Sequence, residues 1–519
     1  MLFERKDRRV LPRWRDFRTT LALGELQNSK EAEPISSEDR DAIARRVEEF
    51  QIDRDIWHAA DLLSSAFVVG DQENADLARN FILSNRDGAP EALISFASGA
   101  SGISRDFSSL KEDAQQGVIH KVRARLRGEP RNAILWVELA RLYTVQGDSR
   151  RALRSMTTAA SLAPDSRFVV RSAARLFLHE HDAPMALKII RNAAGAKRDP
   201  WLLAAEIATA SASRSPALFA KIGIKRNEDD NVSPFARTEL SSALGTLEME
   251  SGRLRKARQL FRKSLEGPNE NSVAQVEWAS RTVGGLEIGK ELLTLPKTFE
   301  VSANLSLHAG DWKYAVAEGM EWLRDQPFSK QPVLFTSYVA SLIEDYDKSI
   351  SILKQSLRTN PDDPGLINNL AFALGSADRL DEAESALKRI DMANCEGLSA
   401  ITLAATTGLL LFRAGFPDRG RELYGLAISR ASARGILKYR VMASLYLARE
   451  ELIASTHAAE TAVNRALVDA SKIDDKEVAF IAEQVRNLEA SLKSKATLQQ
   501  GSGPGAAALK PTQAHKPHF

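Results

Sequence analysis

The stretch Asn132–Asp165, NAILWVELARLYTVQGDSRRALRSMTTAASLAPD, decides the fold of this chain. From Trp136 to Tyr143, large apolar residues recur every three or four positions, which places them on one stripe of a helix. Gly147 is expected to end this helix, because glycine takes the left-handed cap conformation at little cost. Asp148 can then accept the first free N–H groups of a second helix. The stretch therefore predicts two antiparallel helices joined by a tight turn.

The landmarks of this stretch stand at fixed positions. Counted from Ala133 as position 1, they are Trp136 at 4, Leu139 at 7, Ala140 at 8, Tyr143 at 11, Gly147 at 15, Ala152 at 20, Ala159 at 27 and Pro164 at 32. This spacing resembles the tetratricopeptide (TPR) repeat, a helix-turn-helix unit of about 34 residues. One such hairpin cannot bury its own apolar face, so the resemblance implies an array of neighbouring hairpins.

The pattern recurs along most of the chain, with further units starting near residues 167, 238, 296, 330 and 364. We therefore predict an all-α fold, a right-handed α-solenoid of antiparallel helix hairpins that forms a TPR-like superhelix. The predicted order is a basic N-terminal arm at 1–34, N-terminal helices and degenerate hairpins at 35–132, a TPR array at 133–271 with an insert near 225–234, a short irregular joint at 272–295, a second TPR array at 296–434, capping helices at 435–496 and a disordered tail at 497–519.

The charge and cysteine content exclude several classes of protein. Lys and Arg number 71 against 68 Asp and Glu, so no overall attraction to nucleic acid or to an anionic membrane is indicated. Cys395 is the only cysteine, which excludes an intramolecular disulfide and a multi-thiolate metal site. The first residues lack the apolar core of a signal peptide, and no run of about 18 apolar residues is present. We therefore expect a cytoplasmic protein without a membrane span.

Catalytic motifs find little support in the sequence. The tightest histidine cluster, His179-Glu180-His181, lacks the spacing of four residues that places two zinc ligands on one helical face. Gly284-Gly285 lacks the spacing and the lysine of a phosphate-binding loop. Cys395 is more simply a half-buried small residue than a nucleophile. We predict no enzymatic activity, no cofactor and no metal site.

The resemblance implies that the first helix of each hairpin lines a concave surface. Carried onto this sequence, the pattern places Arg141 of one unit beside Arg171 and Arg175 of the next. Three guanidinium groups there would form a basic patch able to hold carboxylates or phosphates in bidentate fashion. The alternative is that they form salt bridges to local acids such as Glu138.

A second set of concave positions has a different character, with Tyr338, Asn368, Asn369 and Phe372 as its candidate partner-binding residues. Side-chain amides can bind a peptide backbone as donor and as acceptor, and the aromatic rings supply rigid apolar contact. Alternatively, the two aromatic residues pack between adjacent hairpins.

The N-terminal arm interleaves basic and apolar residues, with Arg8, Arg9, Arg13, Trp14 and Arg15 as its candidate binding residues. Such a segment can dock on a partner protein or lie along nucleic acid. It can equally fold back over the first repeat and cover that repeat's apolar face.

These observations favour a non-enzymatic scaffold or adaptor that binds an extended or helical segment of one or more partner proteins in the concave groove. The alternative is a nucleic-acid-associated regulator that uses the N-terminal arm and the patch of Arg141, Arg171 and Arg175. The sequence leaves the identity of the partner, the pathway and self-association open.

Overall fold

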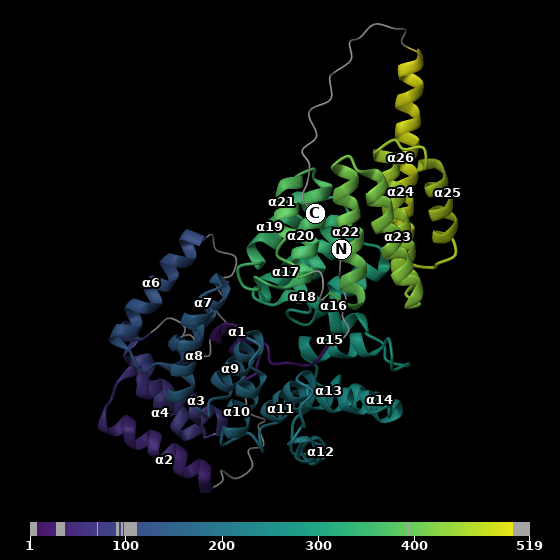
Figure 1. The fold of residues 1–519 in the computed structure, drawn as a ribbon. Coiled ribbons are helices and arrows are strands. Elements are labelled where there is room, and N and C mark those ends of the chain that lie inside the picture. The colour runs from purple at the N-terminus through teal and green to yellow at the C-terminus, as the bar shows by residue number, and fades with distance from the viewer. Residues whose placement is uncertain are drawn as a thin grey trace. The chain divides into compact units, whose positions relative to one another are not determined.

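A computed structural model describes residues 8–26, 37–69, 71–89, 93–94, 97, 112–391 and 395–501. Within these ranges the regular structure is helical, and consecutive α-helices pack as antiparallel hairpins (Figure 1). The predicted all-α fold of helix hairpins is therefore confirmed. Residue contacts divide the chain into two compact units. The N-terminal unit holds the described residues between Arg5 and Ser302 together with Glu321–Ser329, and the C-terminal unit holds Ala303–Met320 and the described residues from Lys330 onward.

The N-terminal unit begins with a largely extended arm, residues 8–26, which ends in the short helix α1 (Phe17–Ala22). Its further helices are α2 (Ser37–Ile52), α3 (Ile56–Val69), α4 (Gln72–Ser84), α6 (Glu112–Gly128), α7 (Ala133–Gln146), α8 (Ser149–Leu162), α9 (Arg167–His179), α10 (Ala183–Asn192), α11 (Pro200–Ala212), α12 (Ala220–Glu228), α13 (Pro234–Glu250), α14 (Leu254–Ser264) and α15 (Glu270–Ala279), with 3-10 turns η1 (Arg86–Gly88) and η3 (Lys290–Thr294). The helices α16 (Phe299–Ala309) and α17 (Trp312–Asp325) contain the points where the chain passes between the units.

The α7–α8 hairpin shows how the local sequence builds one repeat. The Asn132 side chain accepts a hydrogen bond from the Leu135 N–H and caps α7. Gly147 ends that helix with a φ of 79°, and Asp148 caps α8 by accepting from the Arg151 N–H. Each cap contributes on the order of 1 kcal/mol to the free energy of unfolding. Small, fully buried residues let the two helices approach closely, namely Ala140, Ala152 and Ala159.

The structure adds detail to two segments of the N-terminal unit, the predicted insert and the predicted joint. The predicted insert at 225–234 is helical up to Glu228, and within it the Asn227 side chain is buried and accepts a hydrogen bond from Ser241 Oγ at 2.5 Å. A polar residue of the insert is therefore buried and serves as the hydrogen-bond acceptor of Ser241 in α13. The joint expected at 272–295 begins with α15, and the chain then turns at Gly285, whose φ is 75°. No second α-helix follows α15 before α16 in these described residues.

The C-terminal unit continues the series of hairpins. After α16 and α17, its helices are α18 (Lys330–Leu342), α19 (Tyr346–Ser356), α20 (Pro364–Ser376), α21 (Leu380–Leu387), α22 (Gly397–Arg413), α23 (Pro417–Ala433), α24 (Leu437–Ile453), α25 (Ala459–Ala470) and α26 (Lys476–Gly501). The helix α26 extends past 496, the predicted end of the capping helices, into the segment predicted as a disordered tail, and residues 502–519 lie outside the described ranges.

The first half of α26 packs back onto the unit. The rings of Phe480 and Trp312 lie 5.0 Å apart, and Gln484 Nε2 donates to the Leu342 carbonyl oxygen at 3.0 Å. The predicted capping helix therefore contacts the beginning of α17 and the end of α18. Among the described helices, none has both the length and the apolar character required to cross a bilayer.

Candidate functional site

In the N-terminal unit, the first helices of successive hairpins lie side by side, and we call the surface formed by α7, α9, α11, α13 and α15 the first-helix surface. The arm lies along this surface, whose side chains form hydrogen bonds with the main chain of the arm. Asn271 Nδ2 donates to the Leu11 carbonyl oxygen at 3.0 Å, and Gln275 Nε2 donates to the Arg8 carbonyl oxygen at 3.1 Å. Glu138 Oε1 accepts from the Phe17 N–H at 2.8 Å. These side chains bind an extended segment through contacts that do not depend on its sequence.

The guanidinium groups at the start of the arm bind carboxylates and amides of the unit. Arg8 Nε and Nη2 donate to the two oxygens of Glu300 at 2.9 and 3.1 Å, and Nη1 donates to Gln275 Oε1 at 2.6 Å. Arg13 Nη2 donates to Glu300 Oε2 at 2.6 Å. Arg9 donates to Ser211 Oγ and pairs with Glu250. Each of the three arginines thus has a carboxylate partner.

Arg15 lies at the centre of a buried cluster of acids. Its Nε and Nη2 donate to the two oxygens of Asp325 at 2.9 and 2.7 Å, and it also pairs with Glu270 at 2.7 Å and with Glu25 at 3.2 Å. Burial by itself would raise the pKa of Asp325, but the Arg15 guanidinium holds that pKa well below its usual range. Burial raises the pKa of Glu25 to about 7, against the opposing effect of Arg15.

Apolar side chains of the arm fill the space between these polar contacts. Trp14 is 1% exposed, and its ring lies 5.2 Å from that of Phe328. Phe17 is 2% exposed and contacts Phe168 edge to face at 5.0 Å. The arm is therefore part of the packed core of the N-terminal unit. It folds back on its own unit, but these contacts are with the first-helix surface and with residues 300–328, whereas the alternative drawn from the sequence placed the arm over the first repeat.

The structure places the three arginines of the predicted patch on this surface, where two are buried and Arg175 is half-buried. Arg171 Nη1 donates to Glu239 Oε2 at 2.9 Å, and the guanidinium lies 4.9 Å from the centre of the Trp201 ring. Arg141 is 3% exposed and lies close enough to Glu138 to lower the pKa of that carboxyl, although burial raises it overall to about 7.

Arg175 has a different environment from the other two. It donates to Ser329 Oγ at 2.7 Å and lies 5.3 Å from the centre of the Phe328 ring. Burial, and after it the Arg13 guanidinium, lowers the pKa of Arg175 to about 10. The patch is thus covered by the arm and by residues 328–329, and it does not form an open basic surface.

Sequence reasoning missed the acidic side of this site. Glu239, Glu270 and Asp325 are buried, and Glu300 is 7% exposed. Three of these acids lie on α13, α15 and α16, Asp325 ends α17, and their position opposite an arginine-rich segment was the available signal. The negative charge of these buried acids is complementary to the positive charge of the arm.

The candidate residues of the C-terminal unit are also buried. The Tyr338 hydroxyl donates to Glu477 of α26, and the Phe372 ring contacts that of Tyr446 edge to face at 5.5 Å. Asn369 is 0% exposed. Asn368 is buried, and its Oδ1 and Nδ2 have no hydrogen-bond partner among the described residues.

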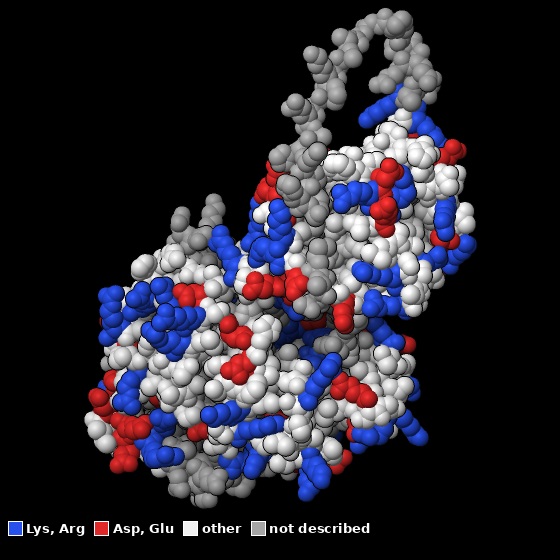
Figure 2. Space-filling view, in the orientation of Figure 1, with Lys and Arg blue, Asp and Glu red and all other residues white. Residues whose placement is uncertain are grey.

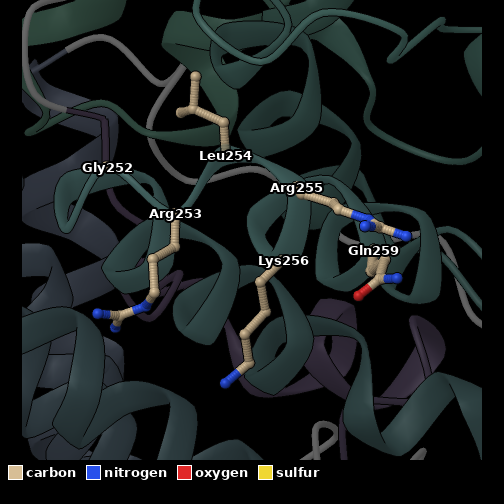
Figure 3. Close-up of a pocket in the computed structure, with 6 residues that line it drawn as sticks. All are labelled: Gly252, Arg253, Leu254, Arg255, Lys256 and Gln259. Carbon is tan, nitrogen blue, oxygen red and sulfur yellow. The ribbon is translucent and has the colours of Figure 1, made fainter.

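A depression of about 610 Å³ opens at the start of α14 (Figure 3). Arg253 and Lys256 line it and pair with Glu248, the lysine at 3.0 Å. Arg255 lies beside Gln259 in the same view. The depression is bordered by cations, whereas the first-helix surface supplies acids.

Few side chains among the described residues are arranged for catalysis or for metal binding. Asp53, Asp55 and His58 bring three ligand atoms near one another, but Asp55 Oδ1 already accepts from the His58 N–H at 2.8 Å as it caps α3. Burial raises the pKa of the Cys395 thiol, and Asp391 adds to the rise, which disfavours the reactive thiolate.

Residues 344–395 match the family model of the tetratricopeptide repeat. No curated protein sequence matches the chain. Similar solved structures include yeast Tom70, with 13% identity over 75% of this chain and 94% of that chain and a TM-score of 0.29. The APC/C hetero-tetramer Cut9-Hcn1 has 12% identity over 86% and 93% with a TM-score of 0.33, and the human IFIT1 dimer with m7Gppp-AAAA has 12% over 88% and 98% with a TM-score of 0.31.

Because these identities and TM-scores are low, the identification depends on the family model and on the hairpins described above. The matched segment begins just before α19 and contains the whole of α20 and α21, which form part of the same series of hairpins as the rest of the described chain. Residues 344–395 thus form a tetratricopeptide repeat, and the rest of the described chain is built of the same kind of antiparallel helix hairpin.

Proposed function

We propose that this protein is a non-enzymatic scaffold or adaptor that binds an extended segment of a partner protein on the first-helix surface of the N-terminal unit. The observation that supports the proposal is the arm itself. Amide side chains of α15 donate to the carbonyl oxygens of Arg8 and Leu11, which is how such a surface binds an extended chain irrespective of sequence. TPR domains are in general modules for protein–protein interaction.

The charges of this surface indicate what kind of segment it would bind. Glu239, Glu250 and Glu270 of this surface, and Glu300 of the adjoining helix α16, face residues of the arm or cations beside it. Bidentate pairs of arginine with carboxylate are among the stronger polar contacts in proteins. A competing partner segment would therefore carry arginines and at least one large aromatic residue, as the arm does with Trp14.

The arm competes with any such partner for the first-helix surface, so it sets the minimum affinity that the partner needs. A tethered segment acts at an effective concentration that reaches the millimolar range for short linkers. A partner segment must therefore exceed the affinity of the arm, or the arm must be weakened first. Binding in this way is an exchange of one basic segment for another.

The alternative use of the arm as a nucleic-acid contact is not favoured. Arg8, Arg9, Arg13 and Arg15 each pair with a carboxylate of the unit. A phosphate would have to replace these acids and leave them buried without partners, which costs several kcal/mol per group, on the order of 3–5 kcal/mol for a broken buried pair.

Exchange can be tested with the intact protein. The probe is a fluorescein-labelled peptide of residues 8–26, and its binding is followed by fluorescence anisotropy. We expect the Arg8→Ala/Arg9→Ala protein, whose own arm is held less tightly at its outer end, to bind the peptide at least tenfold more tightly than the parent protein. Adding Glu300→Gln to that variant should weaken the binding again.

A peptide in which Arg8, Arg9, Arg13 and Arg15 are replaced by Gln serves as the control and should not bind. If the variant keeps its helical content but binds the labelled peptide no better than it binds the control peptide, the first-helix surface does not accept a segment from outside and the proposal fails.

A further inference from the structure

Three of the second helices of the N-terminal unit, α8, α10 and α14, carry charge of one sign. The sequences of α8, α10 and α14 contain Arg and Lys but no Asp or Glu. The acids of the unit that bind the arm lie on the first helices and on α16 and α17 instead.

We define the outer basic face by five exposed residues on α6 and α8, namely Lys121, Arg123, Arg127, Arg150 and Arg154. Both helices pack against α7, and Figure 2 shows Lys and Arg side chains gathered over them. Among the residues that the structure describes, none of the five has an ion-pair partner. The face therefore presents cations whose charge is not already neutralised.

The spacing within this face places like charges next to one another. Arg123 and Arg127, and likewise Arg150 and Arg154, are four residues apart, so each pair lies on one side of its helix with a rise of about 6 Å between them. Like charges at this spacing destabilise a helix by about 0.2–0.5 kcal/mol per pair. An anionic ligand would remove that repulsion.

The chemistry of the face distinguishes between anionic ligands. The exposed large apolar residues of the described chain, such as Leu218 and Leu254, include none on α6, α7 or α8. A protein interface is usually centred on buried aromatic or aliphatic anchors, and a membrane-binding face carries apolar residues that enter the bilayer. Binding to a phosphate backbone needs only cations, and arginine suits phosphate because it can bind two oxygens at once.

We propose that the outer basic face binds the phosphate backbone of a nucleic acid without reading its sequence. This face is separate from the arm and from the first-helix surface, so it does not depend on the proposed exchange of segments. Its residues are exposed, so they can be replaced without removing a buried contact.

The test uses the full-length protein with a fluorescein-labelled duplex DNA and a labelled single-stranded RNA of mixed sequence, measured by anisotropy from 50 to 200 mM salt. The outer variant is Arg123→Gln/Arg127→Gln/Arg150→Gln/Arg154→Gln. The control variant, Lys354→Gln/Lys388→Gln/Lys472→Gln/Lys493→Gln, changes the net charge equally at exposed positions of the C-terminal unit.

We expect the outer variant to lose at least tenfold in affinity at 50 mM salt and the control to lose less than twofold. The slope of log K against log salt for duplex DNA should become shallower by about 0.9 for each phosphate contact removed. Preference for DNA or RNA would show which backbone fits better, and either supports the proposal.

Three results would overturn it. One is the absence of binding by the parent protein to either nucleic acid at 50 mM salt. Another is an equal loss in the two variants, which would mean that net charge alone is responsible. The third is binding to poly-glutamate, or to vesicles containing phosphatidylserine, that exceeds binding to nucleic acid and is lost in the outer variant, because the face would then serve an acidic protein or a membrane.

Discussion

Arg15 and Asp325 form a bidentate ion pair, with nitrogen–oxygen distances of 2.9 and 2.7 Å, between residues 310 positions apart in the sequence. Both side chains are 3% exposed. The pair connects the arm to the segment Glu321–Ser329, which belongs to the same unit.

The first prediction concerns this pair. Arg15→Met should lower the free energy of unfolding by about 3–5 kcal/mol, because it removes the buried cation that Asp325, Glu270 and Glu25 share, although Lys297 still pairs with Asp325 and Arg171 with Glu25. Urea unfolding followed by circular dichroism measures the effect. Arg486→Met removes the exposed pair with Glu483 and should cost less than about 1 kcal/mol. Equal unfolding midpoints for the two variants would mean that the buried cluster does not stabilise the unit.

A second prediction follows from the pKa of Glu138, which is about 7 in the folded protein against a usual value of 4.5. Between these pH values the folded protein holds a proton that the unfolded chain has released. The stability contributed by this group is therefore complete below pH 4.5 and is lost as the pH rises through 7.

Glu138→Gln removes this titration and keeps an oxygen to accept from the Phe17 N–H. We expect the variant to match the parent protein at pH 4 and to exceed its free energy of unfolding by on the order of 1–3 kcal/mol at pH 8. Urea unfolding at both pH values measures this difference, with Glu483→Gln as the exposed control. If the difference in free energy of unfolding between variant and parent does not change with pH, the pKa of Glu138 is not raised in the folded protein.

The contact between Tyr338 and Glu477 leads to a third prediction. Burial, and then the Glu477 carboxylate, raises the pKa of Tyr338, so the hydroxyl remains a donor. Tyr338→Phe should cost about 1.5–3 kcal/mol, the usual contribution of a hydrogen bond to a charged group. Hydrogen exchange should quicken at the start of α26, whereas Tyr314→Phe, at a side chain 51% exposed, should leave it unchanged. Unaltered exchange in Tyr338→Phe would show that this contact does not hold α26 in place.

Two glycines in α23 provide a matched pair for a fourth prediction. A Cβ added at Gly420 would lie 2.5 Å from a Phe412 ring carbon and 2.8 Å from the Gly408 carbonyl oxygen, whereas one at Gly425 meets nothing within 4 Å. Gly420→Ala should lower the free energy of unfolding by about 1–3 kcal/mol, because the added methyl group overpacks the contact between α22 and α23. Gly425→Ala should raise it by up to about 1 kcal/mol through helix propensity. Similar changes from both substitutions would mean that α22 and α23 are not so closely packed.

The hairpins could be predicted from the sequence because their signals are local. The turn at Gly147, the cap at Asp148 and the small residues at Ala140 and Ala152 all act within one repeat. The helix ends could not be predicted where a polar residue is buried against another helix. Asn227 of α12, for example, accepts a hydrogen bond from Ser241.

The candidate site could be predicted only in part. The pattern of the repeat was enough to place Arg171 on a first helix, but not to show that Glu239 and the arm would cover it. That outcome depends on contacts between residues hundreds of positions apart, for which hydrophobic periodicity carries no information. Matching the charge of the arm against acids such as Glu300 would have been the informative comparison.

The ion pair of Arg15 with Asp325 also has a consequence for how the chain is made. At roughly 5–20 residues per second, a ribosome needs on the order of 15–60 s to extend the chain by the 310 residues that separate them. Throughout that time the arm has emerged while its counterpart has not yet been translated. The arm is therefore translated long before Asp325, and its ion pair with Asp325 can form only after most of the N-terminal unit has been made.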